Sequence, residues 1–344
     1  MKIQHKISGG VIVTVAGMMG ALYLILGSSI TAGFGRVEKA DTEKNVFRVV
    51  DAVDASLKGM QNSLMTWSLW DDAYHYVSRP NKAFEESNMG ASAFSGMNIH
   101  ILVFVNNDGK VIHASAFDKK TEKMGPVADS LLSQLKKGAP LTVHKDLNSV
   151  HSGLITLPEG VLMAVAGPVT TTNLDKPYNG TLLFGRWFDG DQQDTLSKVT
   201  HMDLFFTPTQ EEMEGVVVQA RSRDIISGTT IIRDLAGRPT LKVRADIDRA
   251  VARQGRTTIK SVMLALGAVG VVLFIVISLM VNRLVVSRIL ALSNQLAAKN
   301  QAFDFSSPTV VSGTSDEIAV LTESVNGLIA AAQQVFISIG EAGK

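Results

Sequence analysis

The feature that most constrains this chain is a run of 22 residues, 261–282, in which no side chain is ionisable. Lys260 and Arg283 stand on either side of it. A helix rises ~1.5 Å per residue, so this run can cross a hydrocarbon core of ~30 Å, whereas buried helices of soluble domains rarely hold more than about 14 apolar residues in a row. The run therefore predicts a transmembrane helix, and every other segment must lie on one side of a membrane or the other.

A second uncharged stretch begins at residue 7 and continues to Gly35. A cleaved signal peptide usually has an apolar region of about 7 to 15 residues, and the apolar part of this stretch is longer than that. We therefore expect residues 7–30 to be retained as a first transmembrane helix, preceded by a cytoplasmic N-terminus at residues 1–6.

Both termini are expected to lie in the cytoplasm. Lys2 and Lys6 precede the first span, and Arg283 and Arg288 follow the second, as the positive-inside rule requires of cytoplasmic segments. The cations between Arg249 and Lys260 oppose this count, but long domains translocate largely regardless of charge. The prediction is a two-pass protein of the cytoplasmic (inner) membrane.

The segment between the spans, residues 31–259, is too long to be a connector and predicts one sizeable extracytoplasmic domain. The net charge of +1 gives no reason to expect a nucleic-acid partner. The chain has no cysteine, which excludes disulfides and thiolate metal sites, and its histidines show no spacing of four that would pair them on one helix face. No metal or other cofactor is expected.

A seven-residue rhythm follows the first span. Apolar residues from Val46 to Trp67 are spaced alternately four and three apart, which predicts a long amphipathic helix. This helix packs either along the sheet of its own domain or against the same helix of a second chain. The next position in the rhythm is Asp71, and Pro80 is expected to end the helix.

Asp71 stands among tryptophans and tyrosines, and a carboxylate on an inward stripe needs a cation or hydrogen-bond donors. Two interpretations remain open. Asp71 either ties the helix end to a later loop through backbone hydrogen bonds, or it lines a ligand pocket in which the aromatic side chains supply contact area. The candidate ligand-binding residues are Trp67, Trp70, Asp71 and Tyr74, with Arg186 as a pocket wall or counter-charge.

The hydrophobic period changes to two after Pro80, which indicates strands. An Asp-Gly turn at residues 106–109 predicts a hairpin, and a short helix is expected over 127–137. Together these patterns predict an α+β domain with a long N-terminal helix and an antiparallel sheet of five to seven strands. The expected elements are strands 99–105, 110–116, 153–157, 161–166, 181–188, 229–233 and 241–245, a helical patch over 191–201, and a helix over 246–260 that enters the second span.

Three runs resemble a known sensor family. They are Trp70-Asp71-Asp72-Ala73-Tyr74, the strand that ends in Asp108-Gly109, and Asp234-Leu235-Ala236-Gly237-Arg238-Pro239. They resemble the fourth class of CHASE domain, an extracytoplasmic sensor of bacterial and archaeal signalling proteins, over roughly residues 40–245. The resemblance implies a Cache/PAS-like fold and a ligand-sensing role.

Beyond the second span the pattern is helix, connector, helix over residues 283–332. The second helix is expected to start at a capping box, with Thr314 at the cap and Glu317 three residues later. Its apolar stripe runs from Ile318 to Ile339, with Thr322 and Ser324 on the outward side.

This segment resembles a HAMP linker, a parallel dimeric four-helix module that passes motion to an output domain. Asp316-Glu317-Ile318 and Asn326 match its second helix, whereas Ser287-Arg288 stands where a proline is usual and Ala319 where a glycine often follows. The resemblance implies a parallel homodimer. The residues expected to transmit the signal are Ser287, Arg288, Asp316, Glu317, Ile318, Leu321, Val325 and Asn326.

No catalytic role is predicted. Asp71 and Asp72 are adjacent, so on a helix they point about 100° apart and cannot flank one bond. The residues after Asn326 contain no phosphate-binding loop, phospho-accepting histidine or cyclase motif, and 333–344 are expected to begin a coiled coil toward a missing or separate output module.

The prediction is therefore a membrane-bound signal-transduction receptor for an unknown extracytoplasmic small ligand, acting on a cytoplasmic kinase, chemotaxis or cyclic-di-nucleotide output protein. The alternative is a membrane-anchored dimerising scaffold, or a regulatory partner of a separate enzyme, that has no ligand of its own.

Overall fold

The computed structural model describes residues 3–302, 308–309 and 316–342. It divides into two compact units, one formed by residues 35–253 and the other by the described parts of 1–34 and 254–344. Residues 35–253 form the folded domain. Helix α1 (Ile3–Ser68) begins in the second unit and continues into the domain.

Within the domain, α1 buries its apolar stripe against the sheets of its own chain. Val46, Val53 and Leu64 are at most 1% exposed and belong to one core cluster with strand residues such as Phe184 and Val243. Burying each such side chain contributes about 1.5–3 kcal/mol. The predicted amphipathic helix is confirmed, and this face packs on its own domain. The buried stripe comprises Val46, Val49, Val53, Leu57, Met60 and Leu64.

The helix ends at Ser68, not at Pro80 as the sequence predicted. Leu69 forms a parallel bridge with Thr170, whose amide donates to the Ser68 carbonyl at 2.8 Å. Trp70 is extended, with φ −141° and ψ 126°, and a new helix starts after it. The pairing with a distant strand end therefore breaks the helix. The short helices that follow are α2 (Asp71–Ser78), α3 (Lys82–Asn88) and α4 (Ala91–Met97).

The larger sheet has six antiparallel strands in the order β3-β2-β1-β6-β5-β4. The hairpin predicted at 106–109 and the strands expected over 153–157, 161–166 and 181–188 are confirmed, and β3 was not predicted. The helix expected over 127–137 is shorter and forms α5 (Asp129–Leu132) and the 3-10 turn η1 (Ser133–Leu135). The strands are β1 (Ile101–Asn106), β2 (Val111–Asp118), β3 (Lys123–Gly125), β4 (His151–Leu157), β5 (Gly160–Pro168) and β6 (Gly180–Trp187), followed by α6 (Gly190–Thr200).

A second sheet of four antiparallel strands follows α6, in the order β7-β10-β9-β8. The expectation of a single sheet is therefore wrong. The smaller sheet packs directly on α1, because a Cβ added to Gly228 on β9 would lie 2.3 Å from Val46. The helix expected over 246–260 starts at Ala250 and not at Asp246, since β10 continues to Asp248. The strands are β7 (Asp203–Pro208), β8 (Val217–Ala220), β9 (Ile225–Arg233) and β10 (Pro239–Asp248).

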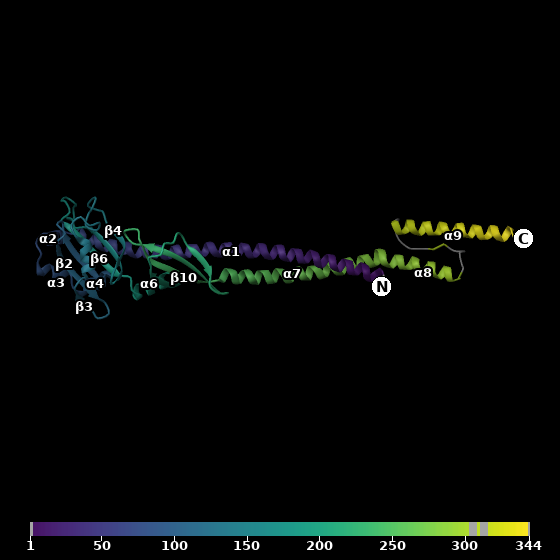
Figure 1. Ribbon diagram of the computed structural model, residues 1–344, viewed down its shortest axis with the longest axis horizontal. Coiled ribbons are helices and arrows are strands. Elements are labelled where there is room, and N and C mark those ends of the chain that lie inside the picture. The colour runs from purple at the N-terminus through teal and green to yellow at the C-terminus, as the bar shows by residue number, and fades with distance from the viewer. Residues whose placement is uncertain (1–2, 303–307, 310–315, 343–344) are drawn as a thin grey trace. The chain divides into compact units, whose positions relative to one another are not determined.

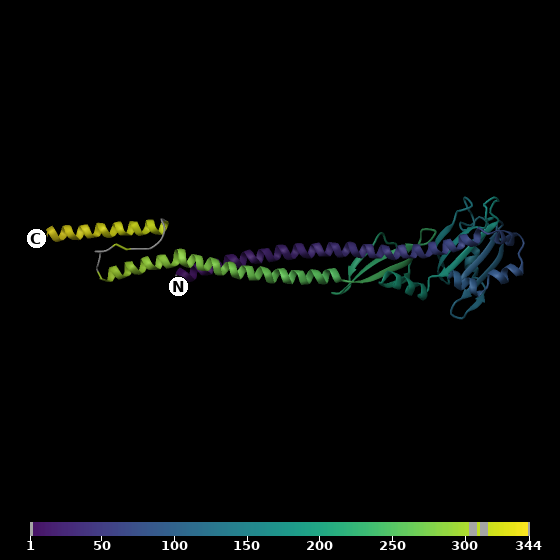
Figure 2. The same cartoon turned by 180° about the vertical axis from the view of Figure 1, so that it is seen from behind.

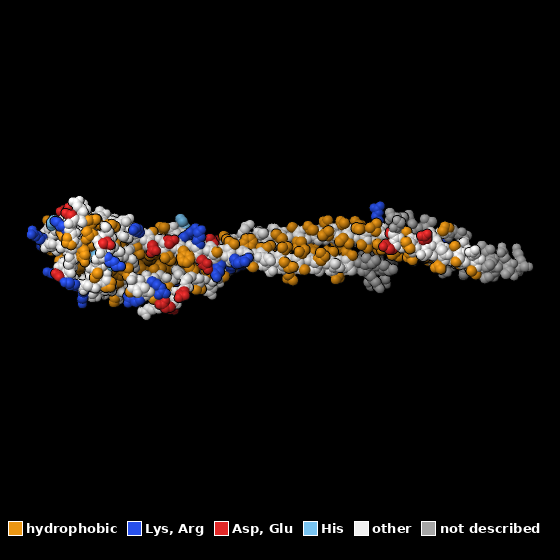
Figure 3. Space-filling view, turned by 90° about the horizontal axis from the view of Figure 1, so that it is seen from above, with side chains coloured by type: hydrophobic (Ala, Val, Ile, Leu, Met, Phe, Trp, Pro, Cys, Tyr) orange, Lys and Arg blue, Asp and Glu red, His pale blue; other side chains and the backbone are white. Residues whose placement is uncertain are grey.

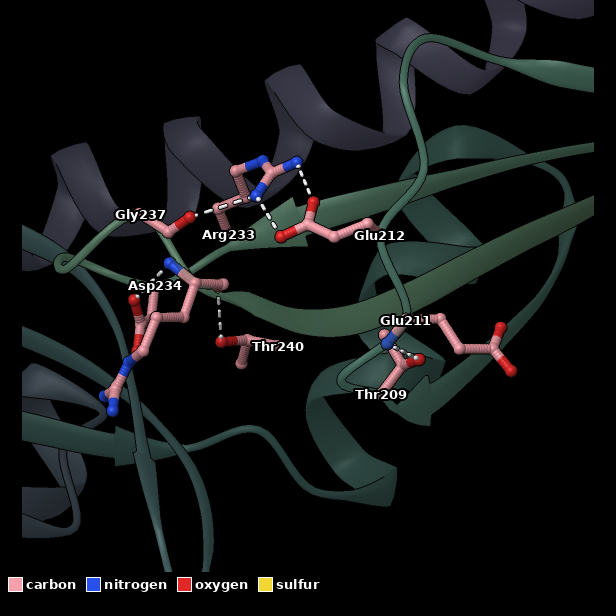
Figure 4. Close-up of polar contacts among 8 residues, drawn as sticks. Thr209, Glu211, Glu212, Arg233, Asp234, Gly237 and Thr240 are labelled. Atoms are coloured by element: carbon pink, nitrogen blue, oxygen red, sulfur yellow. Dashed lines mark hydrogen bonds and ion pairs between the residues drawn. The ribbon is translucent and has the colours of Figure 1, made fainter.

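The turn between β9 and β10 joins the two sheets. Asp234 forms a parallel bridge with Leu154 on β4, the edge strand of the larger sheet. Thr240 Oγ1 lies 3.0 Å from Thr156 Oγ1 on the same strand. Figure 4 shows this turn, where Arg233 contacts both Glu212 and the carbonyl of Gly237. The two sheets therefore meet through specific contacts as well as through their shared backing helix.

In the other unit, the first part of α1 lies beside α7 (Ala250–Val281), as Figures 1 and 2 both show. A Cβ added to Gly255 would lie 2.8 Å from Phe34, and one added to Gly270 would lie 2.0 Å from Met19. Small residues thus permit close helix approach within one chain.

Both of these helices contain a window long and apolar enough to cross a membrane, and only 0% and 6% of the two windows is buried. Their apolar side chains face outward, and Figure 3 shows these side chains covering the paired helices while charged ones gather on the domain. A core helix of a soluble protein would be mostly buried. These two helices are the candidate membrane spans.

After α7 the helix changes its winding. Residues Asn282–Val286 form a π-helical turn, η2, before α8 (Ser287–Ala302), so the uninterrupted α-helix expected here is interrupted. The last helix is α9 (Glu317–Ala342). The predicted cap residue Thr314 lies outside the described residues.

Candidate functional site

The break between α1 and α2 brings the predicted aromatic residues together. Trp67 makes edge contacts with Trp70 and with Phe184 on β6, with ring centroids 6.1 and 6.2 Å apart. Trp70 lies 5.3 Å from Phe84 on α3. Both tryptophans are half-buried and pack against the main core cluster. They therefore join the helix break to the sheet.

Asp71 does not lie on the inward stripe, because α1 has already ended. It is exposed as the first residue of α2, and its Oδ1 accepts a hydrogen bond from the Thr172 amide at 3.0 Å. Tyr74 is half-buried, and its carbonyl accepts a bond of 2.7 Å from the Asn179 side chain. Asp71 and Tyr74 thus both hold the loop between β5 and β6, the kind of contact that the first interpretation of Asp71 expected.

Arg186 lies at the far end of β6 and is not the counter-charge of Asp71. It is 8% exposed and donates to the Asn98 carbonyl at 2.5 Å and to Ser56 on α1 at 3.0 Å. Gln192 of α6 also donates to Ser56, at 3.2 Å. Burial lowers the pKa of Arg186, and Asp189 opposes that effect. Arg186 therefore ties β6 to α1.

A cavity of about 320 Å³ opens beside Arg186. Its lining includes Trp187, His100, Lys119 and Asp189, and the last three also line a smaller hollow that reaches Arg186. The Nδ1 of His100 accepts a bond from the Trp187 amide at 3.0 Å, and burial lowers the pKa of His100. The cavity thus combines an aromatic wall with lysine and aspartate side chains.

Sequence reasoning missed this cavity. Its residues come from the start of β1, the end of β2 and the turn after it, β3, the end of β6 and the start of α6, and no local motif connects them. Only the antiparallel pairing of β1 with β2 and β6 places them together.

A second arrangement missed by the sequence lies where the chain leaves the domain. Arg249, between β10 and α7, donates from Nε and Nη2 to the two carboxylate oxygens of Glu38 on α1, at 2.9 and 2.8 Å. Its Nη1 donates to the Ser222 carbonyl at 3.1 Å. The hydrogen bonds to Glu38 raise the pKa of Arg249. A bidentate ion pair therefore connects the incoming and outgoing segments of the domain.

In the part of this segment that the structure describes, polar contacts join α8 to the start of α9 and Thr309 to α9. Arg288 forms an ion pair with Asp316, whose Oδ1 also accepts the Ala319 amide at 3.0 Å and so caps α9. Asn326 accepts from the amide and hydroxyl of Thr309 at 2.8 and 2.6 Å and donates to its carbonyl at 3.0 Å. Of the residues chosen from the sequence in this segment, Arg288 and Asp316 thus contact each other, and Asn326 contacts Thr309.

The α9 stripe is only partly covered within one chain. Leu321 and Leu328 are 51% and 72% exposed, and Ile318 and Val325 are half-buried. Thr322 is 8% exposed, so its prediction as an outward residue is wrong. The last two residues chosen from the sequence are Glu317, exposed in the first turn of α9, and Ser287, whose hydroxyl donates to the Arg283 carbonyl at 2.9 Å.

Among the residues that the structure describes, no group of three or more histidine, aspartate or glutamate side chains is arranged to hold a metal ion.

Comparisons with known proteins agree with the sensor resemblance. Residues 52–207 match the family model of the CHASE4 domain. The methanogenesis regulatory histidine kinase FilI of Methanothrix harundinacea (strain 6Ac) is 25% identical over 308 residues, which are 85% of this chain and 34% of that protein. The chain thus spans about a third of the length of this curated relative.

The similarity to solved structures is weaker. The periplasmic domain of Vibrio cholerae LuxQ is 15% identical, with a TM-score of 0.39, over 61% of this chain and 97% of that domain. The periplasmic sensory domain of the Campylobacter jejuni chemoreceptor Tlp1 is 9% identical, with a TM-score of 0.31, over 65% of this chain and 98% of that domain.

Proposed function

We propose that this chain, whose residues 52–207 match the family model of the CHASE4 domain, is a membrane-bound receptor that senses an extracytoplasmic small ligand and passes a conformational change to an output module. The two candidate spans would place residues 31–259 outside the cytoplasm and both termini inside. The relative named as a histidine kinase makes a kinase the first output partner to test, before chemotaxis or cyclic-di-nucleotide proteins.

The observation that carries this proposal is the ion pair between Glu38 and Arg249. Glu38 lies on α1, and Arg249 precedes α7, so each partner is continuous in sequence with one candidate span. A change in sheet packing that moves β10 must either move α1 with it or break a bidentate contact. Such a junction can convert a difference in ligand affinity between two packings into helix movement.

We place the ligand in the 320 Å³ cavity beside Arg186. Ligand sites are concave and mix apolar walls with a few charged groups, as this cavity does. Trp67 and Trp70 then support the receptor by packing the helix break against the core. Asp71 and Tyr74 support it by holding the loop between β5 and β6. Their direct contact with ligand is a separate hypothesis.

For transmission we propose a HAMP-like parallel homodimer of α8 and α9. The exposed apolar residues Leu321 and Leu328 support a seam between two chains, because an apolar stripe left uncovered in one chain is suited to meet its copy. The Arg288–Asp316 pair would set the position of α9 against α8.

The receptor role is tested by thermal-shift screening of the full chain in lipid nanodiscs with small metabolites. A ligand at 100 times its Kd should add about 2.7 kcal/mol to the free energy of unfolding. Lys119→Gln at the cavity should abolish the shift, and Lys137→Gln, at the exposed pair with Asp108, should preserve it. A screen in which no metabolite stabilises the chain would favour the ligand-free scaffold.

A further inference from the structure

A second cavity, of about 280 Å³, lies where the two sheets of the domain meet. Its walls come from the edge strand β4, the segment from η1 to residue 141, and the turn between β9 and β10. Leu141, Leu154 and Ile155 line it and are at most 6% exposed, and Leu235 lines it from the turn. One wall therefore belongs to the larger sheet and the other to the smaller sheet.

The turn that forms the second wall is held in one shape. The carboxylate of Asp234 accepts hydrogen bonds from the amides of Ala236 and Arg238, each at 2.9 Å. Leu235 donates its amide to β4 at 2.9 Å, and its side chain lies over Gly153, where an added Cβ would come within 2.7 Å. Because this wall is already ordered, an occupant would not lose affinity to loop ordering.

The charges at this cavity balance each other. Nε and Nη2 of Arg238 lie 2.9 and 2.8 Å from the carboxylate of Asp234. A charged occupant would lose its hydrating water, and both charged side chains of the lining already pair with each other. Binding of an ion here is therefore unfavourable. The lining therefore favours a neutral molecule.

One polar side chain in the lining can still select for a donor. The Nε2 of His151 lies 2.9 Å from the Val143 carbonyl, and because a carbonyl oxygen only accepts, Nε2 carries the proton. In the neutral ring Nδ1 is then an acceptor. With apolar residues around it, this nitrogen would orient a small molecule that has one N–H or O–H group.

We propose that this junction cavity is a binding site for a neutral, compact, mostly apolar molecule with one hydrogen-bond donor, distinct from the cavity beside Arg186. An occupant contacts β4 of the larger sheet and the β9–β10 turn of the smaller sheet at once. β10 starts at this turn and leads to Arg249 and α7, so binding fixes the spacing of the two sheets at the start of the strand that leads out of the domain. The site itself does not depend on the proposed receptor role.

Indole is a suitable probe, because it is neutral and apolar apart from one N–H group. The full chain in lipid nanodiscs is titrated with 5-fluoroindole and followed by fluorine NMR. Ala236→Trp and Ala139→Trp fill the cavity from opposite walls and should each weaken binding at least tenfold. Ala220→Trp, on β8 and outside the cavity, should leave the affinity unchanged.

Two results would overturn the proposal. One is equal binding to the wild-type chain and to the cavity-filling variants, which is what partition into lipid or binding elsewhere would give. The other is binding of fluoroindole-carboxylate as tight as that of fluoroindole, because the anion is expected to bind at least ten times more weakly. Circular dichroism melting verifies folding, and two variants on opposite walls keep the test valid if one fails to fold.

Discussion

Arg249 binds both carboxylate oxygens of Glu38, 211 residues earlier in the chain, at 2.9 and 2.8 Å. The two side chains are 20% and 7% exposed. The only covalent path between them runs through the whole domain, so this pair closes the domain at its two ends. Such a pair is stronger than an exposed salt bridge because water screens it less.

Glu38→Gln should lower the free energy of unfolding by roughly 2–3 kcal/mol, because it leaves the charge of Arg249 without its partner. The loss is smaller than the roughly 3–5 kcal/mol of a fully buried pair, because Arg249 is only partly buried. Urea unfolding of the full chain measures this. The matched control is Glu212→Gln at the exposed pair with Arg233, which should leave the unfolding midpoint almost unchanged. Equal effects of the two variants would contradict a special role for Glu38.

Asp71→Ala should lower stability by about 1 kcal/mol, since it removes the acceptor of the Thr172 amide, whereas Asp71→Asn keeps an oxygen in that place and should cost less. Asp72→Ala, one residue along the same exposed turn, is the control. Thermal melting compares the three. If Asp71→Ala melts with Asp72→Ala, the hydrogen bond to Thr172 does not stabilise the loop.

His144 should make the domain sensitive to acid. Burial and the neighbouring His151 lower its pKa to about 4, and its Nε2 lies 2.8 Å from Thr181 Oγ1. The unfolded chain binds this proton near pH 6.5 and the folded chain only near pH 4, so stability is full above pH 6.5 and falls as the pH drops toward 4. The loss should reach about 3 kcal/mol.

This dependence is measured by chemical unfolding between pH 7 and pH 4. His144→Gln should flatten the profile over that interval, and His75→Gln, at an exposed position on α2, should leave it as in the wild-type chain. A profile that is equally steep in the His144 variant would assign the acid sensitivity to other groups.

Single cysteines at Leu321 and Leu328 should crosslink between chains in native membranes, because apolar seam positions of parallel helices face their copies. Glu323 and Ala330 lie on the opposite side of α9 and are the controls, in place of the buried Thr322. Oxidation followed by gel electrophoresis gives the yield. Equal yields at all four positions would rule out the proposed dimer seam.

Gly228→Ala should destabilise the domain by about 1–3 kcal/mol, because its Cβ would lie 2.3 Å from Val46 on α1 and force the smaller sheet away from the helix. Gly190→Ala is the control, since nothing lies within 4 Å of its added Cβ. Urea unfolding compares both variants with the wild-type chain. A stable Gly228→Ala variant would mean that the sheet can shift without loss.

The parts of the fold that the sequence predicted are those with local causes. The heptad rhythm from Val46 to Trp67 and the Asp-Gly turn at 108–109 each depend on neighbouring residues, and both are confirmed. The break after Ser68 has a distant cause, because Thr170 receives the end of the helix. The pattern of apolar and polar residues around Leu69 does not predict that pairing.

The candidate site was harder to predict for the same reason. The aromatic residues at the helix break were identified because they lie close together in the sequence. For Arg186 the role of counter-charge to Asp71 is wrong, since the direction of β6 decides which end of the domain it reaches. The second sheet was missed in part because β8 has only four residues and little periodicity. Cavities between such elements depend on tertiary contacts that one sequence does not display.

The π turn at 282–286 gives the helix after α7 a different phase from that of a straight continuation. Ser287 donates its amide to the Asn282 carbonyl, five residues back, where an α-helix would use the fourth. One residue of winding is about 100°, so rewinding this turn to α would rotate the face of α8 that carries Arg288 by about that angle with no sliding of α7. A proline at 287 would lack the amide that makes this bond. With serine at 287, the π turn can form, and α8 can rotate about its own axis at the point where it follows the candidate span.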